Sequence, residues 1–97
     1  MKIPDGFSLG AHKITVQKGA RLKDAYGMWH DQKKLIQLAK PKADWGEHFA
    51  LMVFFHELTH AMLEHMGRGD LSEQEHFVDG LSECLTQFHM TQFSKDA

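Results

Sequence analysis

The 97 residues carry a formal net charge of −2, and hydrophobic residues make up 42% of them. This length suits one domain over residues 1–97, and the composition is that of a folded globular protein. The sequence has no basic stripe of the kind that binds a phosphate backbone and no apolar run long enough to span a bilayer, so neither a nucleic-acid nor a membrane partner is expected.

The N-terminal residues and the cysteine content indicate a compartment. Residues 1–6 contain no apolar signal-peptide core. Cys84 is the only cysteine, which excludes both an internal disulfide and a cysteine-based zinc finger. We therefore expect a cytoplasmic protein in a reducing environment.

The first part of the chain predicts short strands. The segment from Phe7 to Gln17 has strand character, with β-branched residues among polar ones towards its end. Tyr26–His30 and Leu35–Ala39 predict two more strands around a polar turn, and Pro41 ends the second of them. Within it, Leu35–Leu38 is expected to be an exposed edge to which an extended peptide can pair.

A long helix is predicted from about Asp44 to Met66. Asp44 and Glu47 have the spacing of a capping box, and Gly67 is a typical C-terminal stop. Apolar residues occur nearly all round this helix, which predicts a central, buried position. Together with the strands, it indicates an α+β fold.

A second helix is predicted to begin near Asp70 or Ser72, each of which has a glutamate three residues later as in a capping box. Apolar residues at spacings of three, four and seven predict a single stripe that packs on the core. These residues are Leu71, Phe77, Val78, Leu81, Leu85 and Phe88.

The central helix carries the sequence HELTH at residues 56–60. His56 and His60 are four residues apart and therefore lie on one helix face, where both imidazoles can bind one zinc ion. Glu57 lies about 100° round the helix, which places its carboxylate beside the metal. There it can take a proton from a zinc-bound water that attacks a carbonyl group. Two histidines and a glutamate in an apolar helix are costly to bury without partners, which favours a metal over hydrogen-bonded core histidines.

A catalytic zinc ion needs a third protein ligand. Leu63 and Met66 occupy the positions where a metzincin has glycine and histidine, which excludes that class. The candidates on the second helix are Glu73, Glu75, Asp79 and Glu83. A helical wheel favours Glu75, at the polar edge of the apolar stripe, although its spacing from Ser72 also fits a capping box.

Asp79 follows Glu75 by one helical turn. A carboxylate at this position can accept the second ring N–H of a ligand histidine and fix its tautomer. A solvated helix residue is the equal alternative.

The motifs at residues 56–60 (HELTH) and 75–79 (EHFVD) resemble the HExxH and ExxxD motifs of gluzincins. Over residues 26–88 the chain also resembles short phage and bacterial metallopeptidase-like proteins. In these, a strand pair and a "YG.W" turn precede an "FFHELTHAML"-like helix, and an "E..VDGLS..L"-like helix closes the domain. The resemblance implies a minimal zincin-like domain with a small twisted β-sheet, an active-site helix and a C-terminal glutamate helix.

The resemblance implies that His56, His60 and Glu75 bind zinc and that Glu57 is the general base. The gap between the two motifs is shorter than in large gluzincins, and no residue is placed by spacing to stabilise an oxyanion, although Tyr26 and His76 are candidates. The predicted function is a zinc metallopeptidase that acts on a peptide or protein. The alternative is a non-catalytic zinc-binding module with a regulatory or interaction role. A homodimer is possible in either case.

Overall fold

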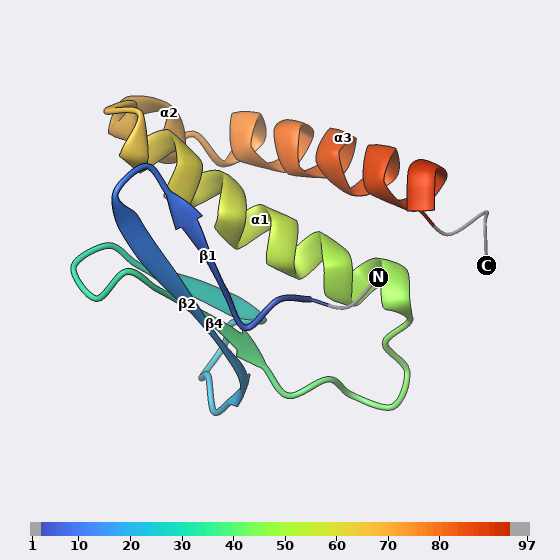
Figure 1. Ribbon diagram of the computed structural model, residues 1–97. Helices are drawn as coiled ribbons and strands as arrows, with labels where there is room; N and C mark the ends of the chain where they lie inside the picture. The colour runs from blue at the N-terminus through green and yellow to red at the C-terminus, as the bar shows by residue number, and fades with distance from the viewer. Residues whose placement is uncertain (1–2, 94–97) are drawn as a thin grey trace.

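The computed structural model describes residues 3–93 and confirms the predicted α+β fold. A sheet of short strands is followed by the helices (Figure 1). The long helix α1 (Glu47–His65) lies across one face of the sheet, and the second long helix, α3 (Glu75–Phe93), packs against α1 on the side away from the sheet. Helix α1 is therefore the middle layer, as its apolar sequence predicts.

The sheet has the strand order β1-β2-β4-β3. Strands β1 (Gly6–Leu9) and β2 (His12–Ala20) are antiparallel, β2 and β4 (Leu35–Ala39) are parallel, and β4 and β3 (Gly27–His30) are antiparallel. The prediction that Leu35–Leu38 forms an exposed edge is therefore wrong. Strand β4 pairs on both sides, which its largely apolar sequence suits, and β1 and β3 are the edge strands.

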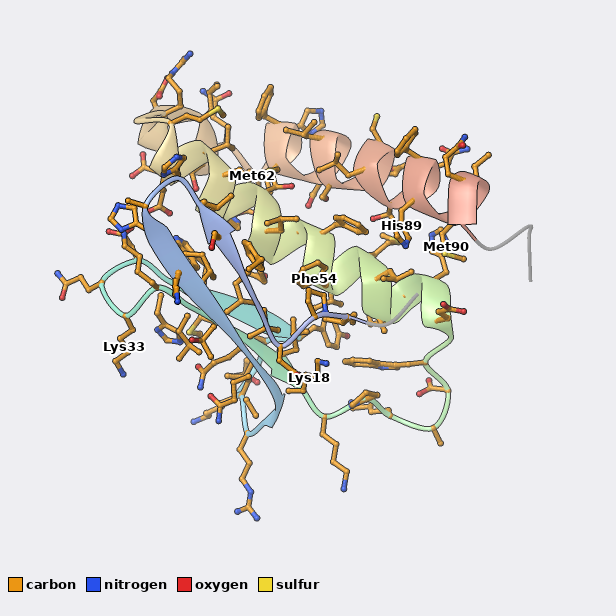
Figure 2. The ribbon with its side chains drawn as sticks, viewed as in Figure 1. Lys18, Lys33, Phe54, Met62, His89 and Met90 are labelled. Carbon is orange, nitrogen blue, oxygen red and sulfur yellow. The ribbon has the colours of Figure 1, made fainter. Side chains whose placement is uncertain are left out.

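The core lies between the sheet and α1. Alternate residues of β2 point towards the helix, as expected for a strand with one buried face. Phe54 of α1, labelled in Figure 2, meets the ring of Phe7 edge-on at a centroid distance of 6.3 Å. The buried cluster consists of Ile14, Val16, Ile36, Leu38, Leu51, Phe54 and Phe55.

Helix α1 begins later than the sequence predicts. Its N-cap is Gly46, which makes no side-chain capping bond, so the predicted capping box of Asp44 and Glu47 is wrong. The physical reason is a preceding turn, in which the amide of Trp45 donates to the carbonyl of Lys42 at 3.0 Å. Asp44 lies within this turn and not at the first residue of the helix.

The second predicted helix is in fact two helices. The short helix α2 (Gly69–Ser72) is separated from α3 by residues 73–74. The N-cap of α2 is Arg68, with no side-chain capping bond. Asp70 does not cap this helix, because its carboxylate accepts two hydrogen bonds from the Arg68 guanidinium, at 3.0 and 2.9 Å.

The face of α3 that packs on α1 differs from the predicted apolar stripe. Val78 is fully buried as predicted, but Phe77 and Phe88 are 41% and 63% exposed. Ser82 and Thr86 are buried instead. Each hydroxyl donates to a carbonyl of its own helix, at 3.2 Å and 2.7 Å, so burial leaves neither donor unsatisfied. The contact face is therefore rotated towards the polar edge of the helix.

Within residues 3–93, no helix combines the length and the apolar character that crossing a bilayer requires.

Candidate metal centre

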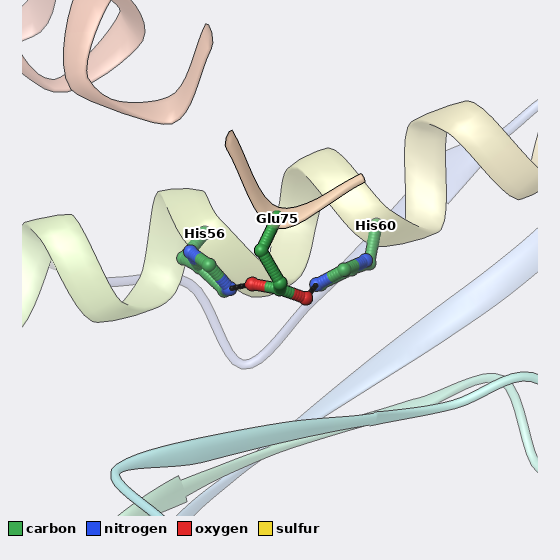
Figure 3. Close-up of side chains that lie close together, drawn as sticks. All are labelled: His56, His60 and Glu75. Carbon is green, nitrogen blue, oxygen red and sulfur yellow. Dashed lines mark ion pairs between the residues drawn. The ribbon is translucent and has the colours of Figure 1, made fainter. Parts of the chain in front are cut away.

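Three of the residues predicted to bind metal come together where α3 begins beside α1. His56 and His60 lie one turn apart on α1, and Glu75 is the first residue of α3. Figure 3 shows the Glu75 carboxylate between the two imidazole rings. Its Oε2 lies 3.4 Å from His56 Nε2, and its Oε1 lies 3.6 Å from His60 Nε2. One ligand atom from each residue lies within 4.8 Å of the other two, so the three residues can hold a metal ion.

The donor set and its spacing fit a divalent ion. A tetrahedral shell with bonds of about 2.0–2.1 Å separates neighbouring ligand atoms by roughly 3.3 Å. The observed nitrogen-to-oxygen separations are 3.4 Å to Oε2 and 3.6 Å to Oε1, and one ligand atom from each residue lies within 4.8 Å of the other two. Both rings turn Nε2 towards the carboxylate, so the three residues face one common position.

The other carboxylates considered as third ligand lie elsewhere. Glu73, Asp79 and Glu83 are outside the three-residue cluster found among residues 3–93. Asp79 contacts the outer nitrogen of His56, and Glu83 lines a cavity beside Glu57. The geometry therefore favours Glu75 as the third ligand.

The outer nitrogen of each histidine also has a partner. His56 Nδ1 lies 3.2 Å from Asp79 Oδ1, the contact that the sequence suggested for Asp79. His60 Nδ1 lies 2.7 Å from Ser72 Oγ, and Ser72 Oγ donates to Glu64 Oε2 at 3.4 Å. With Nδ1–H donating outward, each ring leaves Nε2 unprotonated towards the metal position.

Sequence reasoning considered Ser72 only as one of two candidate helix caps and missed its contact with His60. The spacing of Ser72 and Glu75 is that of a capping box, and this local pattern gives no indication that Ser72 contacts His60. Helix α2 folds back on α1 and buries Ser72 against His60, which no spacing along the chain reveals.

Glu57 is buried beside the cluster, with 8% of its surface exposed. Strand β3 covers it closely at Gly27, where an added Cβ would lie 3.0 Å from Glu57 Cγ and 2.9 Å from Val53 Cγ1. Glycine at this position therefore lets β3 pack closely against the side chains of Val53 and Glu57. Burial raises the pKa of Glu57 to about 7, and the negative charge of Glu75 adds to the effect.

Burial of His60 shifts its pKa in the direction opposite to that of Glu57. Desolvation lowers its pKa, and the positive charge of protonated His56 lowers it further, against the opposing effect of nearby carboxylates. The neutral imidazole, which is the form that binds metal, is therefore favoured.

The cluster opens towards the sheet edge. A cavity of about 490 Å³ lies between β3 and the helices. Gly27 and Met28 line one side of it, and His56, Glu57 and His60 line the other. A ligand that reaches the metal position from this cavity therefore passes along the edge strand.

The two candidates for oxyanion stabilisation are not part of the cluster. The ring of Tyr26 packs edge-on against Trp45 and Phe49, at centroid distances of 5.4 and 5.3 Å, and lines the cavity beside Glu57. His76 is exposed on α3.

Comparison with protein-family models, with curated proteins and with solved structures gave no match. The resemblance to gluzincins therefore rests on the motif residues and their geometry.

We expect the protein to bind about one metal ion per chain. Elemental analysis of wild type purified without added metal should show this stoichiometry. Glu75→Ala should lose the ion because it removes a ligand, and Glu83→Ala should keep it because Glu83 lies outside the cluster. Wild type that stays metal-free after zinc is supplied would contradict the site.

Ser72→Ala should weaken zinc binding by roughly 10- to 100-fold, the usual effect of losing a group that orients a ligand. Competition with a chromogenic chelator measures the affinity. The matched control is Ser82→Ala, because both serines are 6% exposed but the Ser82 hydroxyl bonds only its own helix in the described contacts. Equal zinc affinities for the two variants would refute the role of Ser72.

The raised pKa of Glu57 predicts a pH-dependent stability in the metal-free protein. The ordinary carboxyl pKa is 4.5 and the folded value is about 7, so the folded state holds the extra proton and loses stability as the pH rises between these values. Relative to Glu57→Gln, the free energy of unfolding of the wild type should fall by up to about 3 kcal/mol as the pH rises across this window. Urea denaturation of both proteins in the presence of EDTA at pH 4.5 and pH 8 measures the change. If the two proteins differ in stability by the same amount at both pH values, the prediction is wrong.

Proposed function

We propose that the protein is a zinc-dependent metallopeptidase with Glu57 as its general base. The observation that carries the proposal is the convergence of two imidazoles and a carboxylate at one point, with a second, buried carboxylate beside them and a cavity in front. A purely structural zinc site usually has four protein ligands and is rich in cysteine. Here the cluster has three residues, and Cys84 is not among them.

The donor set supports zinc as the metal. His56 and His60 supply borderline-soft nitrogens and Glu75 supplies a carboxylate oxygen, a combination that catalytic zinc sites use. When bound, zinc supplies a Lewis acid that polarises a carbonyl group and makes water more acidic. Asp79 and Ser72 hold the two rings in the orientation that this binding needs.

In this proposal Glu57 moves the protons of the reaction. It accepts one from the water that adds to the scissile carbonyl, and it then delivers a proton to the amine as the C–N bond breaks. Its burial supports this role, because desolvation favours uptake of a proton by the carboxylate.

Strand β3 supports a peptide as the substrate. It is the edge strand on the β4 side of the sheet, and its residues Gly27, Met28 and Trp29 line the cavity that contains His56 and Glu57. An extended peptide that adds to this edge by main-chain hydrogen bonds would run past the metal position.

We expect Glu57→Gln to lower the rate of peptide hydrolysis by at least about 100-fold while keeping its zinc, because it removes the base and none of the ligands. A fluorogenic peptide library assayed with the zinc-loaded proteins measures the rate. The matched control is Asp44→Asn, which neutralises an exposed carboxylate outside the site and should leave the rate unchanged. Zinc-loaded wild type that cleaves no more than Glu57→Gln would favour the non-catalytic zinc-binding module.

A further inference from the structure

A second cavity, of about 540 Å³, lies directly beside the candidate site. It is bounded by the N-terminal half of α1, by the start of β3 and by α3. His56 and Glu57 form the wall that it shares with the metal centre, so a group in this cavity would be next to the reacting atoms. The metal ligation and the proton transfer do not use this space.

The α1 wall of this cavity is apolar. Phe49, Met52 and Val53 precede His56 by seven, four and three residues, so all four lie on one helix face. All three apolar residues are only partly buried, which leaves apolar surface open to the cavity. Phe49 is fixed by its ring contact with Trp45 at 4.7 Å. The metal-binding face of α1 thus continues as a preformed apolar wall.

The charges around the two cavities have one sign. Among the described residues that line them there are carboxylates and no lysine or arginine. Glu75 and Asp79 contact the histidines, whereas Glu73 and Glu83 are exposed, one beside each cavity. The complete set of carboxylates is Glu57, Glu64, Glu73, Glu75, Asp79 and Glu83. This distribution favours a cationic ligand over an anionic one.

From these two features we infer the substrate class: an extended peptide segment with a large apolar side chain, such as leucine, methionine or phenylalanine, flanked by lysine or arginine. The apolar side chain enters the cavity along Phe49, Met52 and Val53, and the basic residues lie near Glu73 and Glu83. This inference rests on the proposed peptidase function for its consequence, which is cleavage of such segments. The recognition itself depends only on the cavity and its charges.

Binding to Glu57→Gln tests the recognition apart from cleavage. The probes are a short labelled peptide with a central phenylalanine between lysines, the same peptide with glycine in place of phenylalanine, and the same peptide with glutamates in place of the lysines. Fluorescence anisotropy with the zinc-loaded and the metal-free protein gives each Kd. The glycine peptide should bind at least about tenfold more weakly, because it buries no large side chain. The glutamate peptide should also bind more weakly, by a factor that shrinks as salt is added.

Two variants with matched controls assign the effects to this cavity, each in the Glu57→Gln background. Met52→Ala should reduce the preference for phenylalanine over glycine several-fold, whereas Met62→Ala, also partly buried on α1 but not lining the cavity, should not. Glu83→Gln should reduce the preference for lysine over glutamate about two- to fivefold, as expected for an exposed charge. Asp44→Asn is its control.

The outcomes separate this inference from the proposed function. Equal affinity for the three peptides, or no binding of any, would overturn the inference. Selective binding without hydrolysis by zinc-loaded wild type would remove the peptidase and leave a peptide-recognition site. Hydrolysis by wild type with no preference for apolar and basic residues would leave the peptidase and overturn the inference.

Discussion

The site depends on the packing of α3 on α1 through buried residues such as Val78 and Thr86. This packing brings Glu75 to the Nε2 atoms of His56 and His60. It requires α3 to begin beside the middle of α1, so the chain must turn back soon after α1 ends. The short helix α2 makes this turn, and it carries Ser72 to the outer nitrogen of His60. The break at residues 73–74, which interrupts what the sequence predicts as one helix, lets α2 and α3 take different directions.

Helix α1 satisfies two opposite demands at once. Towards the sheet it contributes Leu51, Phe54 and Phe55 to the core, and on its other faces it buries or half-buries Glu57 and the two histidines. The polar side chains are tolerable because the outer nitrogen of each histidine has a partner, both rings are only half-buried, and Glu57 can be neutral near pH 7. Apolar residues occur nearly all round this helix, and this pattern predicts its burial on nearly all sides.

The sequence predicts those parts of the site that depend on local periodicity. His56 and His60 share a face because they are four residues apart, and the wheel that places Glu75 at the edge of α3 uses the same geometry. Ser72 and the edge position of β3 depend on tertiary contacts and strand order, which residue spacing does not encode. The predicted stripe of α3 failed at Phe88 for a related reason, because hydrophobicity alone does not recognise that hydroxyl groups bonded to their own helix pack well.

One electrostatic cause connects the stability, the metal site and the proposed substrate. Carboxylates gather around the start of α3 with no lysine or arginine in the described walls of either cavity. Burial raises the pKa of Glu57, and the negative charge of Glu75 raises it further, so ionising Glu57 opposes folding at high pH; a divalent cation at the cluster would offset this negative charge. Glu73 and Glu83 are not among the three candidate ligands, so a bound ion would leave both free to contact a peptide. Glu73 lines the cavity in front of the cluster, and Glu83 lines the cavity beside Glu57. In the proposed function, the same excess of negative charge favours binding of the metal and then of a basic peptide.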